Sequence, residues 1–108
     1  MGLQSVCIVV ALIALLAAGC LQASTSERAS KSCEELCLQA VEAGLNLSEG
    51  PCLGVLLEQG LENWVCDVSH QPRTPADNMP YNQCSAFLRG EATHFVEVNE
   101  NCSVFRTQ

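Results

Sequence analysis

The sequence predicts a small α+β domain stapled by disulfides, in which an N-terminal helix packs on a two- or three-stranded antiparallel sheet. Three observations lead to this prediction. Apolar residues recur at helical spacing after Ser32, two short stretches after Asn63 alternate in polarity, and six cysteines are spread from Cys33 to Cys102. The chain has 108 residues, a length that suits a single domain.

An unbroken apolar run from Val6 to Ala18 is typical of the core of a signal peptide and is short for a membrane span, which needs about 20 residues. The junction Leu16-Ala-Ala-Gly-Cys20 resembles the lipobox of prokaryotic lipoproteins, where a peptidase cuts before the cysteine. The resemblance implies a signal peptide over 1–19 and a lipid on Cys20, which would hold the protein at the outer face of the membrane. Ordinary cleavage after Cys20 or Ala23 is the alternative, and it would leave a secreted, free protein.

The exported part divides into two regions. Residues 20–31 are rich in Ser, Thr, Ala and Glu without an apolar period, and we expect a flexible tether there. The domain is expected over 32–108. Ser32 and Glu35 have the spacing of a capping box, and the helix that follows is expected to stop at Gly44, a natural left-handed residue.

Two strands are predicted from alternation of polarity. In Trp64–Val68 the residues Trp64, Cys66 and Val68 share one face, while Val65 and Asp67 share the other. Thr93–Val98 is the second strand, with Phe95 opposite to its two valines. Cys102–Phe105 is expected as a third, edge strand, whereas the segment 45–61 stays undecided between strand and helix.

The connection between these two strands is rich in proline. Pro72, Pro75 and Pro80 argue against regular structure over Gln71–Tyr81, and a short helix is expected from Asn82 or Gln83 to Leu88. An ordered loop of this length is often functional.

Six cysteines remain after Cys7 leaves with the signal and Cys20 is lipidated or lost. An even number in a small exported domain predicts three disulfides, each adding about 2–4 kcal/mol of stability. The six are Cys33, Cys37, Cys52, Cys66, Cys84 and Cys102. Sequence alone leaves 15 pairings open, although Cys33 and Cys37 share one helix face and are expected to bridge to different elements.

The net charge of −7 restricts the possible partners. Nucleic-acid affinity comes largely from Lys and Arg that neutralise phosphates, so the charge argues against nucleic-acid binding. It also argues against a basic patch on an anionic lipid surface. Two glycosylation sequons, Asn46-Leu-Ser48 and Asn101-Cys-Ser103, are physically possible acceptors on an exported chain.

The candidate binding surface surrounds the end of the first predicted strand. If the two strands pair, His70 and His94 would lie on the same sheet, and the loop that carries Arg73 and Asp77 would form a rim. Strand direction, which the sequence leaves open, decides whether the two histidines meet. Rigid prolines would hold such a rim at low entropic cost. The structural alternative is that both histidines are half-buried strand-end residues with backbone partners and that Arg73 pairs with Asp77.

Two other classes of function compete with binding. A metal site or an enzyme would use Asp67, His70, His94 and Glu97, because histidine is the usual general base and metal ligand. A redox carrier would cycle Cys33 and Cys37. The sequence has no His-x-x-x-His or Cys-x-x-Cys spacing and no nucleophile–base pair, so it predicts no cofactor and favours a binding module over an enzyme.

Several short motifs resemble a family of small exported, cysteine-rich proteins from archaea. The resemblance covers Cys33 to Cys102, nearly the whole exported domain, and implies export, lipidation and disulfides without an activity. Its motifs are Trp64-Val-Cys-Asp-Val68, His70, Pro72-Arg73, Asp77-Asn78, Asn82-Gln-Cys84 and His94-Phe-Val-Glu-Val98.

Overall fold

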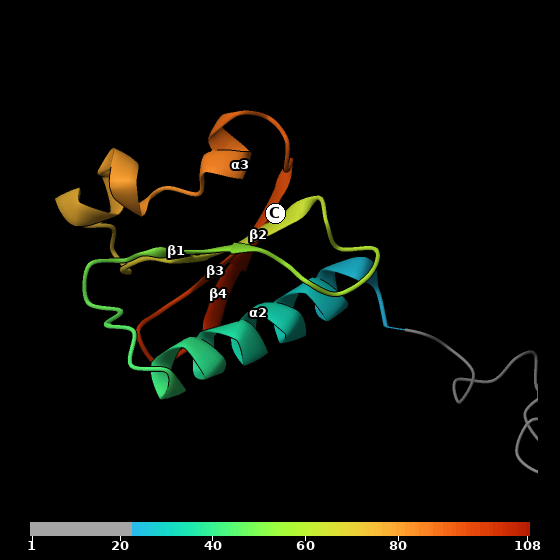
Figure 1. Ribbon diagram of the computed structural model, residues 1–108, viewed down its shortest axis with the longest axis horizontal. Coiled ribbons are helices and arrows are strands. Elements are labelled where there is room, and N and C mark those ends of the chain that lie inside the picture. Colours follow the sequence, from blue (N-terminus) through green and yellow to red (C-terminus); the bar gives the residue numbers. More distant parts are fainter. Residues whose placement is uncertain (1–22) are drawn as a thin grey trace, which may run out of the picture.

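The computed structural model describes residues 23–108, and the predicted signal peptide and Cys20 lie outside the described residues. One long helix, α2 (Thr25–Glu42), crosses one face of a four-stranded sheet, as Figure 1 shows. The strands are β1 (Cys52–Val55), β2 (Trp64–Val68), β3 (His94–Val98) and β4 (Val104–Thr107). The predicted α+β class, with an N-terminal helix on a disulfide-stapled sheet, is confirmed.

The helix begins earlier than the sequence pattern predicts. Ser24 is its N-cap, and the Ser24 hydroxyl accepts from the Glu27 amide at 3.1 Å while the Glu27 carboxylate accepts from the Ser24 amide at 3.0 Å. The predicted start at Ser32 was therefore wrong, and so was the expectation of a flexible tether through residue 31. Only Ala29 in the first turns reaches the core, which is why this part shows no apolar period.

The sheet has the order β1-β2-β3-β4 and is mixed rather than antiparallel. The outer pairs β1–β2 and β3–β4 are antiparallel, whereas β2 and β3 run parallel with Trp64 beside His94 and Val68 beside Val98. The expectation of two or three antiparallel strands was wrong in these details. The segment 69–93 returns the chain to the starting end of the sheet, and a parallel pair needs a crossover of at least about a dozen residues.

That crossover holds three single-turn helices instead of an irregular loop. Prolines occupy the first position of η2 (Pro75–Asn78) and η3 (Pro80–Asn82), where the missing N–H costs nothing. They are followed by α3 (Ser85–Leu88), which confirms a short helix before Gly90. The prolines thus start turns of 3-10 helix rather than only preventing structure.

The two faces of the sheet are covered by different elements. The face that carries Trp64, Cys66 and Val68 packs with Val96 and Val98 against α2, as the alternation predicted. The other face carries Val65 and Phe95, which pack with residues of the crossover around Cys84 and Ala92. The sheet is therefore the middle layer, with the crossover over part of its second face (Figure 1).

Three disulfides staple these layers, as predicted, and the described residues contain no free cysteine. Two of them join α2 to the sheet, one at β2 and one at the turn between β3 and β4. The third joins β1 to the crossover on the opposite face. The pairs are Cys33–Cys66, Cys37–Cys102 and Cys52–Cys84. Cys33 and Cys37 bridge to different elements, as predicted. They form no disulfide with each other, as a redox carrier that cycles this pair would need.

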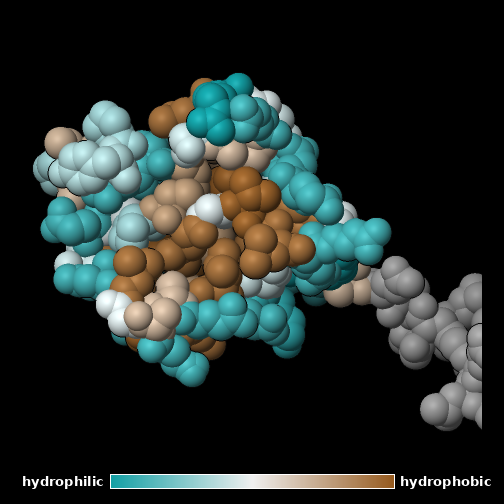
Figure 2. Space-filling model, in the orientation of Figure 1, coloured by the Kyte–Doolittle hydropathy of each residue, from teal (hydrophilic) through white to brown (hydrophobic). Residues whose placement is uncertain are grey.

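Apolar surface gathers in the middle of the face shown in Figure 2, where β1 lies above α2. β1 is an edge strand, and Leu57, two residues beyond its end, is 85% exposed. Within residues 23–108, no helix has both the length and the apolar character that crossing a bilayer requires.

Candidate functional site

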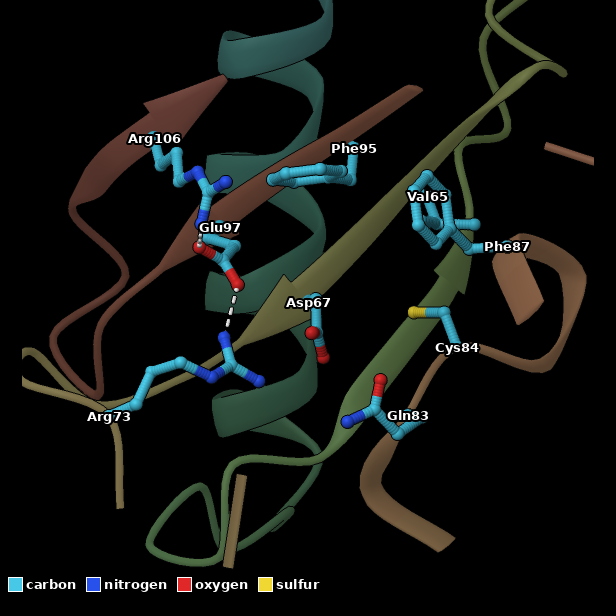
Figure 3. A pocket seen from close by; sticks show the side chains of 9 residues that line it. All are labelled: Val65, Asp67, Arg73, Gln83, Cys84, Phe87, Phe95, Glu97 and Arg106. Carbon is cyan, nitrogen blue, oxygen red and sulfur yellow. Dashed lines mark hydrogen bonds and ion pairs between the residues drawn. The ribbon is translucent and has the colours of Figure 1, made fainter. Parts of the chain in front are cut away.

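A small hollow of about 170 Å³ opens on the sheet face that α2 does not cover. Figure 3 shows its lining, to which β2, β3, β4 and the crossover all contribute. The lining residues are Val65, Asp67, Arg73, Gln83, Cys84, Phe87, Phe95, Glu97 and Arg106. The hollow therefore combines an aromatic wall with four charged side chains.

The register of the two central strands places two carboxylates side by side. Asp67 of β2 is the direct neighbour of Glu97 of β3, and both follow an apolar residue two places earlier on the same face. In a strand, residues two apart share a face, so Val65 and Phe95 form the apolar part of the hollow and the carboxylates its polar part. The sequence placed Asp67 and Glu97 in one candidate set, and the structure brings this pair together.

Two arginines neutralise Glu97, whose side chain is only 6% exposed. Arg73 Nη1 donates to Glu97 Oε2 at 2.9 Å, and Arg106 Nη1 lies 3.6 Å from Glu97 Oε1. Figure 3 shows the two guanidinium groups on either side of this carboxylate. Hydrogen bonds between a guanidinium and a carboxylate are strong and directional, so Glu97 holds both arginines beside the hollow.

Asp67 lacks such partners. Its Oδ1 atom is buried and has no hydrogen-bond partner among the described residues. Burial, followed by the charge of Glu97, raises the pKa of Asp67 from 3.8 to about 7, although the nearby Arg73 lowers it. Near neutral pH this carboxyl is thus present in both its protonated and its ionised form.

Gln83 and the aromatic residues complete the hollow. Gln83 Nε2 donates to the Asp77 carbonyl at 2.9 Å, which fixes the side chain and leaves its Oε1 as an acceptor. Phe87 and Phe95 meet edge to face at 5.3 Å between ring centroids, and the Arg106 guanidinium lies 5.0 Å from the Phe95 ring centroid. The lining therefore combines acceptors, Asp67 and Gln83 Oε1, with the guanidinium donors of Arg73 and Arg106.

His70 and Asp77, two predicted binding residues, organise the crossover instead of facing the hollow. His70 Nδ1 lies 2.9 Å from Asp77 Oδ1, and Asp77 Oδ2 accepts from the amides of Thr74 and His70 at 2.8 and 3.1 Å. Asp77 is only 2% exposed. Both residues are structural, as the alternative expected, but its pairings were wrong: Asp77 pairs with His70, and Arg73 pairs with Glu97.

His94 lies apart from the other predicted binding residues. It stacks on Trp64 with ring centroids 4.6 Å apart, at the starting end of β3 and on the face of Val96. His70 follows β2 at the other end of the sheet, because the two strands are parallel. The structure thus gathers His70, Arg73 and Asp77 and separates His94, and the set Asp67, His70, His94 and Glu97 does not converge.

One group of potential metal ligands does lie together. The sulfurs of Cys52 and Cys84 and a carboxylate oxygen of Asp67 are all within 4.8 Å of one another. Both sulfurs belong to one disulfide, so they offer no thiolate to a metal while the bridge is closed. The group is a disulfide beside a carboxyl rather than a metal centre.

Sequence reasoning missed most of the hollow. Gln83, Phe87 and Arg106 come from three separate elements, and no local pattern joins them. The alternation in β2 and β3 was the available signal, since it already put Asp67 on the face of Val65.

Fold and site together define a disulfide-stapled α+β domain with a small surface hollow that carries both acidic and basic side chains. Comparison with known proteins finds no family model, no curated protein and no solved structure that matches the chain. The resemblance to small exported archaeal proteins therefore stays a prediction.

Proposed function

We propose that the protein is an exported binding module, held at the outer face of a membrane by lipid on Cys20, that binds an amine-bearing side chain in the hollow beside Asp67. The observation that carries the binding part is the buried Asp67 Oδ1, an acceptor without a partner among the described residues. A buried polar atom in that state gains when a ligand supplies the missing donor.

The size of the hollow favours a single side chain over a whole small molecule. Ligand pockets usually measure about 300–1,000 Å³, and this one measures about 170 Å³. A lysine side chain suits it, since the apolar stem can lie along Val65 and the two phenylalanines while the ammonium reaches Asp67 and Gln83 Oε1.

The charge of the chain supports a basic partner. A net charge of −7 raises the local concentration of cations and speeds their encounter at low ionic strength. Export is supported by the three disulfides, which persist mainly in oxidising compartments, together with the apolar run before Cys20. The alternative of a metal-binding protein or enzyme is supported less, because His94 lies far from His70 along the sheet.

Binding is tested by NMR titration of the ¹⁵N-labelled domain with Nα-acetyl-lysine methylamide. Shifts are expected at Val65, Phe95 and the Gln83 side-chain amide, and they should be absent with the norleucine analogue, which lacks the ammonium. Asp67→Asn should abolish them, while Glu91→Gln, an exposed carboxylate beside α3, should leave them unchanged. Equal shifts from the norleucine analogue would refute recognition of an amine.

The anchor is tested by the intact mass of the protein extracted from its native membrane, which reports lipid on Cys20 directly. Cys20→Ser should release the protein into the medium or leave it unprocessed. A Cys20→Ser chain found in the membrane at the normal processed mass would refute lipidation without touching the binding proposal.

A further inference from the structure

We propose that the Cys52–Cys84 bridge is a redox-active disulfide that exchanges with an external dithiol, and that the Asp67 carboxyl is the proton donor and acceptor of this exchange. The inference concerns an activity of the bridge and does not depend on what the hollow binds. It rests on the accessibility of one disulfide, on the groups that surround its sulfurs and on the position of Asp67.

The three bridges differ in accessibility. Cys33, Cys66 and Cys37 are fully buried, and Cys102 is 6% exposed. Cys52 is only half-buried, and the Cys52–Cys84 bridge lines two surface hollows: Cys84 faces the hollow of Asp67, and both cysteines line a second one beside α3. Figure 3 shows the Cys84 sulfur pointing into the first hollow. Cys84 is 5% exposed, close to the value for Cys102, so access to this bridge comes from the half-buried Cys52 and from the two hollows that the bridge lines.

The environment of the Cys52 sulfur makes it the better leaving group of the two. A bulge in β1 and the positive φ of Gly54 turn the Gly54 amide onto Cys52 Sγ, to which it donates at 3.1 Å. A hydrogen bond to sulfur stabilises the thiolate, and a stabilised thiolate is the better leaving group. Cys84 faces the hollow of Asp67 and Cys52 does not, so attack from there on Cys84 would displace Cys52.

Both sulfurs lie near groups that handle a proton. A carboxylate oxygen of Asp67 is within 4.8 Å of each Sγ. The Cys66 carbonyl oxygen lies 3.6 Å from Cys84 Sγ and 3.8 Å from Cys52 Sγ, which is within reach of the S–H of a newly formed thiol. In the reduced state, the Cys66 carbonyl would accept a hydrogen bond from one of the two new thiols.

The exchange balances as follows. A thiolate of the external dithiol bonds to Cys84 Sγ, the Cys84–Cys52 bond breaks, and Cys52 leaves as a thiolate that takes a proton from Asp67. The second thiol of the partner gives up its proton to the Asp67 carboxylate, and its thiolate then attacks the partner sulfur of the mixed disulfide. Cys84 is released and protonated from water, so one disulfide and two thiols give one dithiol and one disulfide.

Burial raises the pKa of Asp67 most, and charged groups on the neighbouring elements add to or oppose this shift. Glu97 of β3 and Asp77 of η2 raise its pKa, Arg73 lowers it, and Arg106 of β4 lines the same hollow, while α3 (Ser85–Leu88) carries no charged residue. The resulting pKa of about 7 lets this carboxyl give and take protons near neutral pH.

Opening this bridge leaves the core stapled. Cys33–Cys66 and Cys37–Cys102 still join α2 to the rest of the domain, whereas Cys52–Cys84 joins only the edge strand β1 to the crossover. The reduced protein is therefore expected to stay folded and to reoxidise to the same pairing.

The test treats the native oxidised protein with dithiothreitol, quenches with iodoacetamide and maps the alkylated cysteines by peptide mass. Two labels at Cys52 and Cys84 are expected at least about tenfold faster than labels at the other four cysteines. Simultaneous opening of all bridges, or first labels elsewhere, would overturn the proposal. The double variant Cys52→Ser/Cys84→Ser should remain folded and lose the fast phase.

The proton role is tested by the pH dependence of that fast phase, corrected for the thiolate fraction of the reductant. The wild-type rate should fall as pH rises through about 7, because only protonated Asp67 can donate. Asp67→Asn should be slow at every pH by about tenfold or more, and Glu42→Gln, an exposed carboxylate at the end of α2, should behave as wild type. An Asp67→Asn protein that is fast at every pH would show that the carboxylate merely repels the thiolate, and the proton role would be wrong. The wild-type profile alone decides the question if the variant does not fold.

Discussion

Asp77 Oδ1 lies 2.9 Å from His70 Nδ1, and this contact closes the start of the crossover onto η2. The other carboxylate oxygen accepts from two backbone amides, so a single buried side chain fixes the path of the segment from Ser69 onward. The relationship makes the histidine a structural residue and yields the first prediction.

Asp77→Asn should destabilise the domain by about 2 kcal/mol, the usual worth of hydrogen bonds to a charged group. Chemical denaturation at pH 6 measures the free energy of unfolding. Glu100→Gln is the matched control, because Glu100 Oε1 contacts His70 Nε2 at 3.2 Å from an exposed position, and surface pairs contribute little. Equal effects of the two variants would contradict the structural role of Asp77.

The same pair predicts a window of stability. The hydrogen bond to Asp77 raises the pKa of His70 above 6.5, so its contribution is full below that value and is lost as pH rises through the raised pKa. Burial opposes ionisation of Asp77, but hydrogen bonds from Thr74 and His70 outweigh it and lower the pKa below 3.8. The contribution of Asp77 is full above 3.8 and is lost as pH falls through the lowered pKa. The pair should stabilise the domain most between these limits, and His70→Ala should flatten the alkaline side of the profile.

The contribution of Asp67 to stability should fall as pH rises, the reverse of the contribution of Asp77. Its pKa is raised from 3.8 to about 7, so the unfolded chain ionises first and stability falls as pH rises between these values. The shift corresponds to at most about 4 kcal/mol. Asp67→Asn should therefore match wild type below pH 4 and exceed it at pH 8, as followed by melting temperature across pH. A variant less stable than wild type at pH 8 would show that the carboxylate has a partner in solution.

Gly50→Ala tests the packing around the crossover. Gly50 has φ +72°, and an added Cβ would collide with the Asp77 carboxylate and approach the Val68 carbonyl. Gly44→Ala is the control, because its φ is also positive, at +94°, but nothing lies within 4 Å of its Cβ. The difference between the two variants isolates the collision, and overpacking should add about 1–3 kcal/mol to the loss for Gly50→Ala.

His94→Ala separates the two faces of the sheet. The variant loses the stack on Trp64, which should cost about 0.5–1.5 kcal/mol and change the tryptophan emission. Amine binding in the hollow should stay unchanged, because His94 is outside its lining. Loss of binding in this variant would instead favour the surface predicted from sequence.

The fold class could be predicted from local patterns, because these patterns show which residues of each segment are buried. The stripe of Cys33 and Cys37 marked the face of α2, and the alternation in Trp64–Val68 separated its two faces correctly. Six cysteines predicted three bridges, although their pairing depends on which elements meet in space.

The position of the site depends on the relative direction of β2 and β3, and no local sequence pattern reports that direction. Whether His70 and His94 meet depended on that direction. The crossover returns the chain to the start of β2, so the strands are parallel and His94 lies beside Trp64. β1 was not predicted, because Gly54 and a bulge interrupt the alternation of polar and apolar residues along this strand. Arg106 reaches the hollow from the last strand, a distance in sequence over which no pattern extends.

The order of the disulfides has a consequence for proteolysis. Cys33–Cys66 overlaps Cys37–Cys102 along the sequence, so every peptide bond between Cys33 and Cys102 is spanned by at least one bridge. A protease that nicks the chain once in this region, even in the crossover, leaves two fragments covalently joined. Such a nick would appear only on a reducing gel, and a molecule exposed to enzymes outside the cell could survive it in one piece.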